Sequence, residues 1–195
     1  MKLVVLKFGG TSVADVPQIK KIALKVKNEV NQGYKVIVVV SAMAGVTNNL
    51  IDLVKSTSKS LNYSEYDVVL STGEQVTSAL LASVLNNLNI KARSWLGWQV
   101  PIISDESHSK AVIEEIKTDN IFKFLKKNQV AIISGFQGIS KENRITTLGR
   151  GGSDTSAVAM AAAFSAERCD IYTDVDGVYT TDPRIVKSAK KLDLI

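Results

Sequence analysis

Apolar residues follow two patterns that alternate along the chain. The stretches KLVVLKF at 2–8 and KVIVVVS at 35–41 are almost continuously apolar, which is typical of strands buried on both faces of a parallel sheet. Between them, apolar residues recur with helical spacing from Ile19 to Val30, and Gly33 ends the pattern. Strand, helix and strand in this order predict a βαβ unit with a right-handed crossover.

The same alternation continues along the rest of the chain. It predicts helices at 47–59, 67–88, 119–127 and 153–166, with Gly73 as a candidate break in the second of these, and strands at 91–95, 100–104, 130–136 and 169–175. Residues 137–152 are predicted to form a loop or hairpin with polar tips. We therefore expect one α/β domain, a three-layer α/β/α sandwich with a central, mostly parallel sheet.

Composition narrows the class of protein. Apolar residues make up 45% and charged residues 22% of the chain, as in soluble globular proteins. The dense apolar runs are far shorter than the ~18 residues of a membrane-spanning helix, and the N-terminus lacks the length and cleavage site of a signal peptide. We expect a cytoplasmic protein without a membrane partner.

Charge and metal-ligating residues exclude further classes. The 24 Lys and Arg residues exceed the 19 Asp and Glu residues by a net +5, but they are scattered and no RNP-like aromatic motif accompanies them. We therefore expect no nucleic-acid partner. Cys169 and His108 are the single residues of their types, which excludes an internal disulfide and a zinc cluster. Both are interpreted as structural or incidental.

Unusual residues follow the carboxyl ends of four predicted strands. These segments are GGTS after the first strand, SAMAGVT after the second, GFQG after VAIIS and TDVDGVYTTDPR after CDIY. In open α/β sheets, ligands bind at this edge. The four segments are therefore expected to border one crevice.

The first segment, KFGGTS, is neither a P-loop nor a dinucleotide fingerprint. Gly9 and Gly10 would let backbone N–H groups approach an anion at the start of the first helix, where the helix dipole favours phosphate. The alternative is an ordinary turn with Lys7 on the surface. The segment alone leaves both open.

Two further clusters carry charged groups. In TTLGRGGSDT, Arg150 lies among glycines, and its guanidinium is suited to grip a carboxylate, whereas Ser153 or Asp154 could simply cap the following helix. Glu74 follows a glycine inside a helical pattern, where a lone glutamate is most often solvated.

Six motifs together resemble the aspartate kinases of the amino acid kinase superfamily. They are KFGGTSVAD, VVVSAMAGVTNNL, LSTGEQVTSALLA, ISGFQGI, TTLGRGGSDTSAVAMAAA and DIYTDVDGVYTTDPRIV, in this order, over nearly the whole chain. The short spacing between VTNNL and LSTGE is similar to the shorter, monofunctional bacterial form. The resemblance implies an amino acid kinase-like fold. It also implies ATP-dependent phosphorylation of the β-carboxylate of L-aspartate, the first step towards lysine, threonine, methionine and diaminopimelate.

The resemblance also implies roles for individual residues. Lys7 would lie against the transferred phosphoryl group, and Asp154 would hold that lysine in place. The residues implied in substrate binding are Ser41, Thr47, Glu74, Phe136, Arg150, Gly151, Gly152 and Ser153. Those implied in ATP binding are Lys7, Phe8, Gly9, Gly10, Thr173, Asp174, Tyr179, Asp182 and Arg184. Mg²⁺ would be held mainly by the nucleotide, without protein ligands.

Aspartate kinases usually continue beyond the matched motifs into ACT regulatory domains. The resemblance therefore implies that residues 1–195 are an amino acid kinase domain that is incomplete at its C-terminal end and has no ACT domain. It leaves a homo-oligomer open, without the usual ACT interface. Two alternatives also stay open: a superfamily kinase with another acceptor, and a non-catalytic fragment that folds and binds nucleotide.

Overall fold

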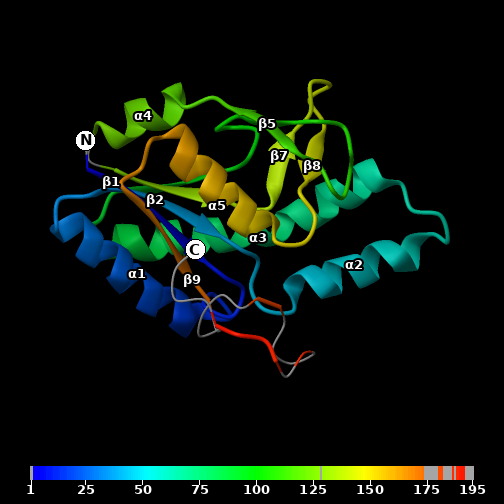
Figure 1. Cartoon of the computed structure of the whole chain (residues 1–195), viewed down its shortest axis with the longest axis horizontal. Helices are drawn as coiled ribbons and strands as arrows, with labels where there is room; N and C mark the ends of the chain where they lie inside the picture. Colours follow the sequence, from blue (N-terminus) through cyan, green and yellow to red (C-terminus); the bar gives the residue numbers. More distant parts are fainter. Residues whose placement is uncertain (1, 128, 174–179, 182–185, 187, 192–195) are drawn as a thin grey trace.

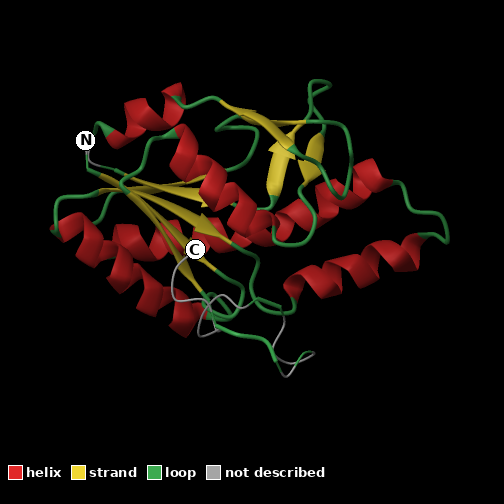
Figure 2. Ribbon diagram, viewed as in Figure 1, coloured by secondary structure: helices red, strands yellow, loops and turns green. Residues whose placement is uncertain are grey.

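A central sheet of five parallel strands forms the middle layer of the protein (Figures 1 and 2). The computed structural model describes residues 2–127, 129–173, 180–181, 186 and 188–191. The strand order is β3-β6-β2-β1-β9. The strands are β1 (Leu3–Phe8), β2 (Lys35–Val40), β3 (Ala92–Trp95), β6 (Val130–Ser134) and β9 (Arg168–Tyr172).

Helices cover both faces of this sheet. Helices α1 (Val16–Asn31) and α3 (Tyr63–Asn87) pack on one face, and α4 (Asp119–Leu125) and α5 (Gly152–Ala163) pack on the other (Figure 1). Helix α2 (Val46–Thr57) lies beside the N-terminal half of α3 and has no fully buried residue. The predicted three-layer α/β/α sandwich is confirmed.

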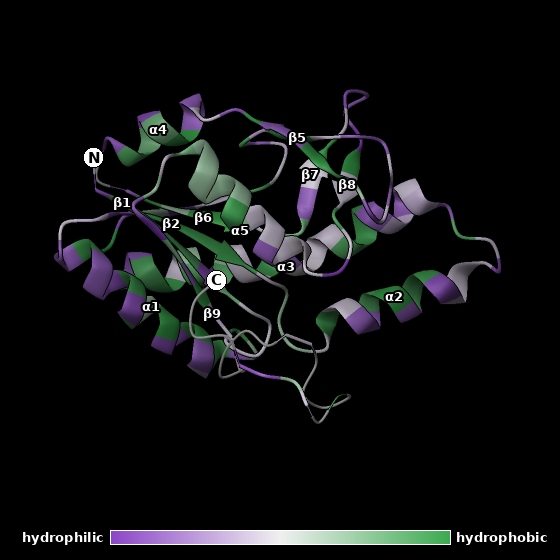
Figure 3. Ribbon diagram, in the orientation of Figure 1, coloured by the Kyte–Doolittle hydropathy of each residue, from purple (hydrophilic) through white to green (hydrophobic). Residues whose placement is uncertain are grey.

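The alternation of side chains along the strands separates two hydrophobic cores. Val4, Leu6 and Phe8 of β1 face the core under α1 and α3, whereas Leu3 and Val5 face the core under α4 and α5. Figure 3 shows the strands as largely hydrophobic and the outer face of α1 as hydrophilic. A continuous apolar run is thus required because the strand is buried on both faces.

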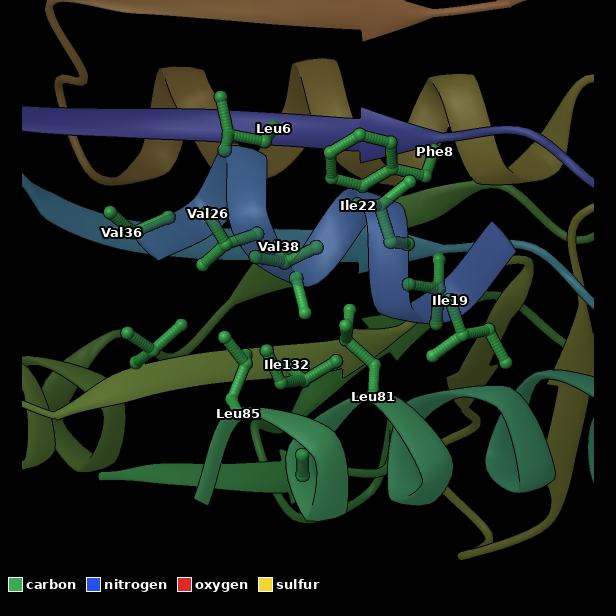
Figure 4. Packing of buried hydrophobic residues seen from close by; sticks show 14 of the residues in the cluster. Leu6, Phe8, Ile19, Ile22, Val26, Val36, Val38, Leu81, Leu85 and Ile132 are labelled. Atoms are coloured by element: carbon green, nitrogen blue, oxygen red, sulfur yellow. The ribbon is translucent and has the colours of Figure 1, made fainter. Parts of the chain in front are cut away.

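The helices dock on the sheet through apolar side chains at helical spacing. Figure 4 shows Ile22 and Val26 of α1, together with Leu81 and Leu85 of α3, directed toward the strands. Asp15 caps α1 by accepting a 2.8 Å hydrogen bond from the N–H of Gln18. The first βαβ unit therefore forms as its pattern predicts, with parallel pairing of β1 and β2.

A second, smaller sheet is not predicted by the alternation of elements. It has the order β5-β4-β7-β8, and only the β4–β7 pair is parallel. Its strands are β4 (Ile102–Ser104), β5 (Ile113–Ile116), β7 (Gln137–Ile139) and β8 (Ile145–Thr147). The predicted hairpin at 137–152 is confirmed as β7 and β8, but these strands leave the central sheet and form a separate sheet beside α3.

The candidate break at Gly73 is wrong, because α3 runs without interruption from Tyr63 to Asn87. A Cβ on Gly73 would lie 2.8 Å from the Cβ of Ala42, so glycine permits a close approach between α3 and the segment after β2. By length and composition, α3 is also able to cross a membrane. Half of its most apolar stretch is buried inside the protein, where Leu81 and Leu85 pack in the core.

Candidate active site

A cleft of about 800 Å³ opens at the carboxyl ends of β1, β2 and β6, between α2, α3 and the start of α5. Every residue predicted to bind the substrate lines it, and so do the predicted catalytic pair and one glycine of the first loop. These residues are Lys7, Gly10, Ser41, Thr47, Glu74, Phe136, Arg150, Gly151, Gly152, Ser153 and Asp154. Three of the four segments expected to border one crevice, those after β1, β2 and β6, therefore line this cleft, whereas most of the fourth, after β9, lies outside the described residues.

Lys7 is held inside this cleft by an ion pair. It lies near the end of β1, its side chain is 9% exposed, and its Nζ is 2.5 Å from Oδ1 of Asp154. Asp154 lies in the first turn of α5. The N-cap of this helix is Gly151, and no side chain caps its first N–H groups. A surface position for Lys7 is wrong, because its side chain is buried and paired with Asp154. A capping role for Ser153 or Asp154 is also wrong, because Gly151 is the N-cap and both residues lie inside α5.

Glu74 places a buried carboxylate at the cleft. The residue is 3% exposed, its Oε1 accepts a 2.9 Å hydrogen bond from the N–H of Ala42, and its Oε2 is buried without a partner among the described residues. Burial raises the pKa of Glu74 to about 7, against the smaller opposing effect of the Ala42 hydrogen bond. A buried, unpaired carboxylate oxygen is suited to receive a cationic group of a ligand.

Arg150 lies on a loop that requires glycine. Gly149 and Gly151 both have a φ of 74°, and a Cβ on Gly152 would lie 2.8 Å from Cδ2 of Phe136. The side chain of Arg150 is exposed at the cleft and forms no ion pair with any described residue. Its guanidinium is therefore available for an anionic group of a ligand.

Two helices begin at the cleft and add to its attraction for anions. The N-caps of α2 and α5 are Gly45, with a φ of 79°, and Gly151, and neither helix has a side-chain cap bond. Both glycines line the cleft. Uncapped helix N-termini present N–H groups and a positive dipole end, which favour phosphate and carboxylate groups.

A family model matches nearly the whole chain. The model of the amino acid kinase family covers residues 2–195. The chain belongs to the amino acid kinase family. Its cleft, with an ammonium, a guanidinium and two helix N-termini, is thus the candidate active site.

Similar proteins in this family are aspartokinases. The chain is 56% identical over 195 residues to an aspartokinase of Rickettsia conorii, a match that covers 98% of the chain and 49% of that relative. It is 53% identical to the aspartate kinase Ask_LysC of Stutzerimonas stutzeri, over 100% of the chain and 47% of that relative. The chain therefore spans about half the length of these relatives.

Solved aspartate kinases share the fold. The structure of E. coli aspartokinase III in complex with aspartate and ADP has a TM-score of 0.84 and 29% identity, over 98% of this chain and 54% of that chain. The aspartate kinase from Synechocystis has a TM-score of 0.79 and 46% identity, over 96% of this chain and 31% of that chain.

The residues predicted to bind ATP are only partly brought to the cleft of this amino acid kinase. Gly10 lines it, whereas Phe8 is fully buried in the core and stacks on Tyr172 with ring centroids 4.7 Å apart. The N–H of Gly9 donates to the carbonyl oxygen of Tyr172 at 3.2 Å, so this N–H belongs to the β1–β9 pairing. A Cβ on Gly9 would lie 3.4 Å from Nζ of Lys7, which places Gly9 beside the cation.

The other predicted ATP ligands follow β9. Thr173 is exposed directly after that strand. Asp174, Tyr179, Asp182 and Arg184 lie outside the described residues. Their roles stay predictions.

Sequence reasoning misses one wall of the cleft. Tyr63, Tyr66 and Leu70 of α3 line it, together with Ser109 and Thr147 from the second sheet and its connections. Leu70 precedes Glu74 by four residues within the predicted helix, so the helical pattern would have placed it on the same face. Tyr63 and Tyr66 precede residue 67, where the helix was predicted to begin, whereas α3 begins at Tyr63. Ser109 and Thr147 carry no such signal, because they reach the cleft only through the second sheet.

The described part of the chain has no group of three or more His, Cys, Asp or Glu side chains that could hold a metal ion. Asp154, the acidic residue nearest the cation, is already paired with Lys7. These residues do not fit a metal ion held by the protein alone.

Proposed function

We propose that the protein is an aspartate kinase, which transfers the γ-phosphoryl group of ATP to the β-carboxylate of L-aspartate and yields 4-phospho-L-aspartate and ADP. The observation that carries this proposal is the buried carboxylate of Glu74, with an unpartnered oxygen, in the same cleft as the Lys7–Asp154 pair. An acceptor without an ammonium group would leave that oxygen unpaired, which is costly in a buried site.

The cleft supplies a partner for each charge of the amino acid. Glu74 would accept the α-ammonium group, and Arg150 would grip the α-carboxylate with its planar fork. Ser41, Thr47 and Ser153 line the same cleft and would add hydroxyl partners. The remaining group, the β-carboxylate, would then face Lys7.

Transfer requires no general base. A free aspartate side chain has a pKa of about 3.9, so the β-carboxylate is ionised near neutral pH and attacks the γ-phosphorus directly. A bond forms between a carboxylate oxygen and the γ-phosphorus while the bond from that phosphorus to the β–γ bridging oxygen breaks, and ADP leaves. The Lys7 ammonium, held by Asp154, would stabilise the negative charge on the transferred group.

We propose that ATP enters with Mg²⁺ bound mainly to its own phosphates. Gly10 and the first turns of α2 and α5 would offer N–H groups to these phosphates. Thr173, Asp174, Tyr179, Asp182 and Arg184 are proposed to contact the nucleotide from the segment after β9. Phe8 and Gly9 would act indirectly. Phe8 would support the site by stacking on Tyr172, and Gly9 would leave room for the Lys7 ammonium because it has no side chain.

The relatives support this proposal. E. coli aspartokinase III is described in complex with aspartate and ADP, and it shares the fold over 98% of this chain. We propose accordingly that residues 1–195 are a kinase domain of a cytoplasmic biosynthetic enzyme. Its product would lead to lysine, threonine, methionine and diaminopimelate.

A coupled ADP-release assay with ATP and Mg²⁺ tests the acceptor. L-Aspartate is compared with succinate, which lacks the ammonium group, and with 3-aminopropanoate, which lacks the α-carboxylate. Each analogue leaves one buried or cationic group unpaired, so kcat/KM is expected to fall by about 100-fold or more. ATP binding by calorimetry without ADP release on any acceptor would contradict the proposal and favour a non-catalytic fragment.

A further inference from the structure

A second buried carboxylate, Asp67, lies behind the cleft wall. It is on α3, is 0% exposed, and accepts hydrogen bonds from three neighbours. Its Oδ2 is 2.7 Å from Nδ1 of His108, its two oxygens are 3.0 and 3.1 Å from the N–H nitrogen of Ser109, and Oγ1 of Thr147 donates to its Oδ1 at 2.5 Å. Both carboxylate oxygens are thus satisfied by groups outside α3.

These partners lead directly to the arginine loop. Thr147 ends β8, and Arg150 follows three residues later. The carbonyl oxygen of Thr147 accepts a 2.9 Å hydrogen bond from the N–H of Ala111, and a Cβ on Gly149 would lie 3.2 Å from the carbonyl oxygen of Ser109. Asp67 therefore ties α3 to both segments that support the Arg150 loop.

The same helix carries Glu74, seven residues further along. Residues seven apart lie on one face of a helix, so Asp67 and Glu74 both face the cleft side of α3. Glu74 is fixed by the N–H of Ala42, and Asp67 fixes the base of the Arg150 loop. One rigid helix thus sets the separation between the two groups proposed to hold the ammonium and the α-carboxylate.

We propose that Asp67, together with His108 and Thr147, is a positioning element that holds Arg150 at the correct distance from Glu74 and so determines affinity for the amino-acid substrate. The inference rests on the proposed function, because it assigns the α-carboxylate to Arg150. The hydrogen bonds of the Asp67 cluster reach the end of β8 and residues 108–109, and none of those described joins it to β1 or β9. The arginine loop continues into the first turn of α5, which is also proposed to face the phosphates, but ATP has further proposed partners at Gly10 and α2. The element is therefore expected to affect binding of L-aspartate much more than binding of ATP.

Fold stability alone is a weaker explanation of this cluster. Burial of a charged carboxylate costs desolvation free energy that its hydrogen bonds roughly repay, so such a group adds little net stability. The carboxylate does, however, fix the positions of its partners relative to α3, because it accepts hydrogen bonds from a hydroxyl, a ring nitrogen and a backbone N–H in defined directions. A precise loop position is what this arrangement provides.

Two pairs of variants test the element by calorimetric titration with L-aspartate and, separately, with ATP and Mg²⁺. Thr147→Val removes the hydroxyl that bonds Asp67, and Thr147→Ser keeps it. His108→Phe removes the ring donor, and His108→Asn places an amide near the position of Nδ1. Loss of either tie is expected to weaken L-aspartate binding about fivefold or more, with ATP affinity within about twofold, and the Ser and Asn variants are expected to recover most of the loss.

Asp105→Asn is the matched control. Asp105 accepts hydrogen bonds from Ser107 and Val112 in the same connection but does not touch Asp67. Circular dichroism of every variant shows whether it folds. The Thr147 and His108 pairs alter the same cluster from different elements, so if the variants of one pair do not fold, the other pair still tests the proposal.

The outcomes separate this inference from the proposed function. If the unmodified protein binds L-aspartate but the Val and Phe variants bind it as tightly, the positioning role is overturned. An equal loss of L-aspartate and ATP affinity would also overturn it, because that pattern indicates general disruption. Absence of L-aspartate binding by the unmodified protein would overturn the proposed function itself, and the inference with it.

Discussion

Glu74 combines a negative charge with burial, two properties that oppose each other. The residue is 3% exposed, and burial raises the pKa of its carboxyl group from the usual 4.5 to about 7. A purely structural role would not require a charged side chain here, because a glutamine of the same shape would accept the Ala42 N–H equally well without the cost of burying a charge. Such perturbed groups are typical of functional sites, where a ligand supplies the missing countercharge.

The raised pKa predicts a pH dependence of catalysis. Glu74 must be ionised to bind the substrate ammonium group, so kcat/KM for L-aspartate is expected to fall about tenfold per pH unit below the Glu74 pKa of about 7. Steady-state kinetics across this range measure it. In Glu74→Gln, kcat/KM is expected to be low at every pH and no longer to fall as the pH drops below 7. A wild-type profile that stays flat below pH 7 would contradict the assignment.

The same shift predicts an effect on folding stability. Because the folded pKa of Glu74 lies above the usual 4.5, the folded protein binds this proton more tightly than the unfolded chain does. The contribution of Glu74 is then fully present below pH 4.5 and is lost as pH rises to about 7, by about 3 kcal/mol.

Urea unfolding of the wild type and of Glu74→Gln at about pH 5 and about pH 8 measures this difference. The advantage of Gln over Glu is expected to be larger at the higher pH by about 2 to 3 kcal/mol. Equal differences at the two pH values would show that Glu74 is not buried as described.

Helix α3 organises the cleft as a single rigid element. It bears Asp67 under the arginine loop, Glu74 at the ammonium subsite and Gly73 against the segment after β2. The glycine is the point where the helix meets Ala42, and the Ala42 N–H is the donor that orients Glu74. Close packing at this point therefore determines where the Glu74 carboxylate lies.

Gly73→Ala is expected to destabilise the protein, although alanine is the better helix former by about 1 kcal/mol. The new Cβ would lie 2.8 Å from the Cβ of Ala42, so the two segments must separate, with a net cost of about 1 to 3 kcal/mol and weaker L-aspartate binding.

Urea unfolding and calorimetry compare this variant with Ser83→Ala, an exposed position on the same helix that gains propensity without new contacts. A Gly73→Ala variant as stable as Ser83→Ala would contradict the packing role.

Secondary structure was predictable where a local pattern determines it. The continuous apolar runs of β1 and β2 and the helical spacing of α1 predict the βαβ unit, because burial on both faces leaves little freedom. The β7–β8 hairpin and a strand near β4 were predicted, but their assembly into a second sheet was not, since its strands are only three or four residues long and β4 pairs with β7 across a long connection. Gly73 was misread because its contact with Ala42 is tertiary.

The architecture of the whole molecule explains which parts of the site were predictable. Parallel strands bring their carboxyl ends to one edge, so the segments after β1, β2 and β6 were expected to meet, and their residues line one cleft. Lys7 lies at this edge, but its pairing with Asp154 was implied only by the resemblance to aspartate kinases. The solvated position that the helical pattern favoured for Glu74 is wrong, because its burial depends on tertiary packing of α3. The Asp67 cluster was not predictable, because its bond to Thr147 joins residues 80 positions apart through the second sheet.

Chemical trapping of the product tests the central claim most directly. Hydroxylamine converts an acyl phosphate into a stable hydroxamate, which mass spectrometry identifies. With ATP, Mg²⁺ and L-aspartate, the wild type is expected to yield the β-hydroxamate of aspartate. Lys7→Ala is expected to lose at least about 1,000-fold in rate while remaining folded, because the Lys7 ammonium is proposed to neutralise the transferred group.

Lys20→Ala, a change at an exposed lysine of α1, is the control and is expected to retain the wild-type rate. Formation of aspartyl β-hydroxamate by the wild type and by Lys20→Ala, with none above background from Lys7→Ala, is the predicted result. No hydroxamate from the wild type, or an undiminished yield from Lys7→Ala, would contradict the assignment of this cleft as an aspartate kinase active site.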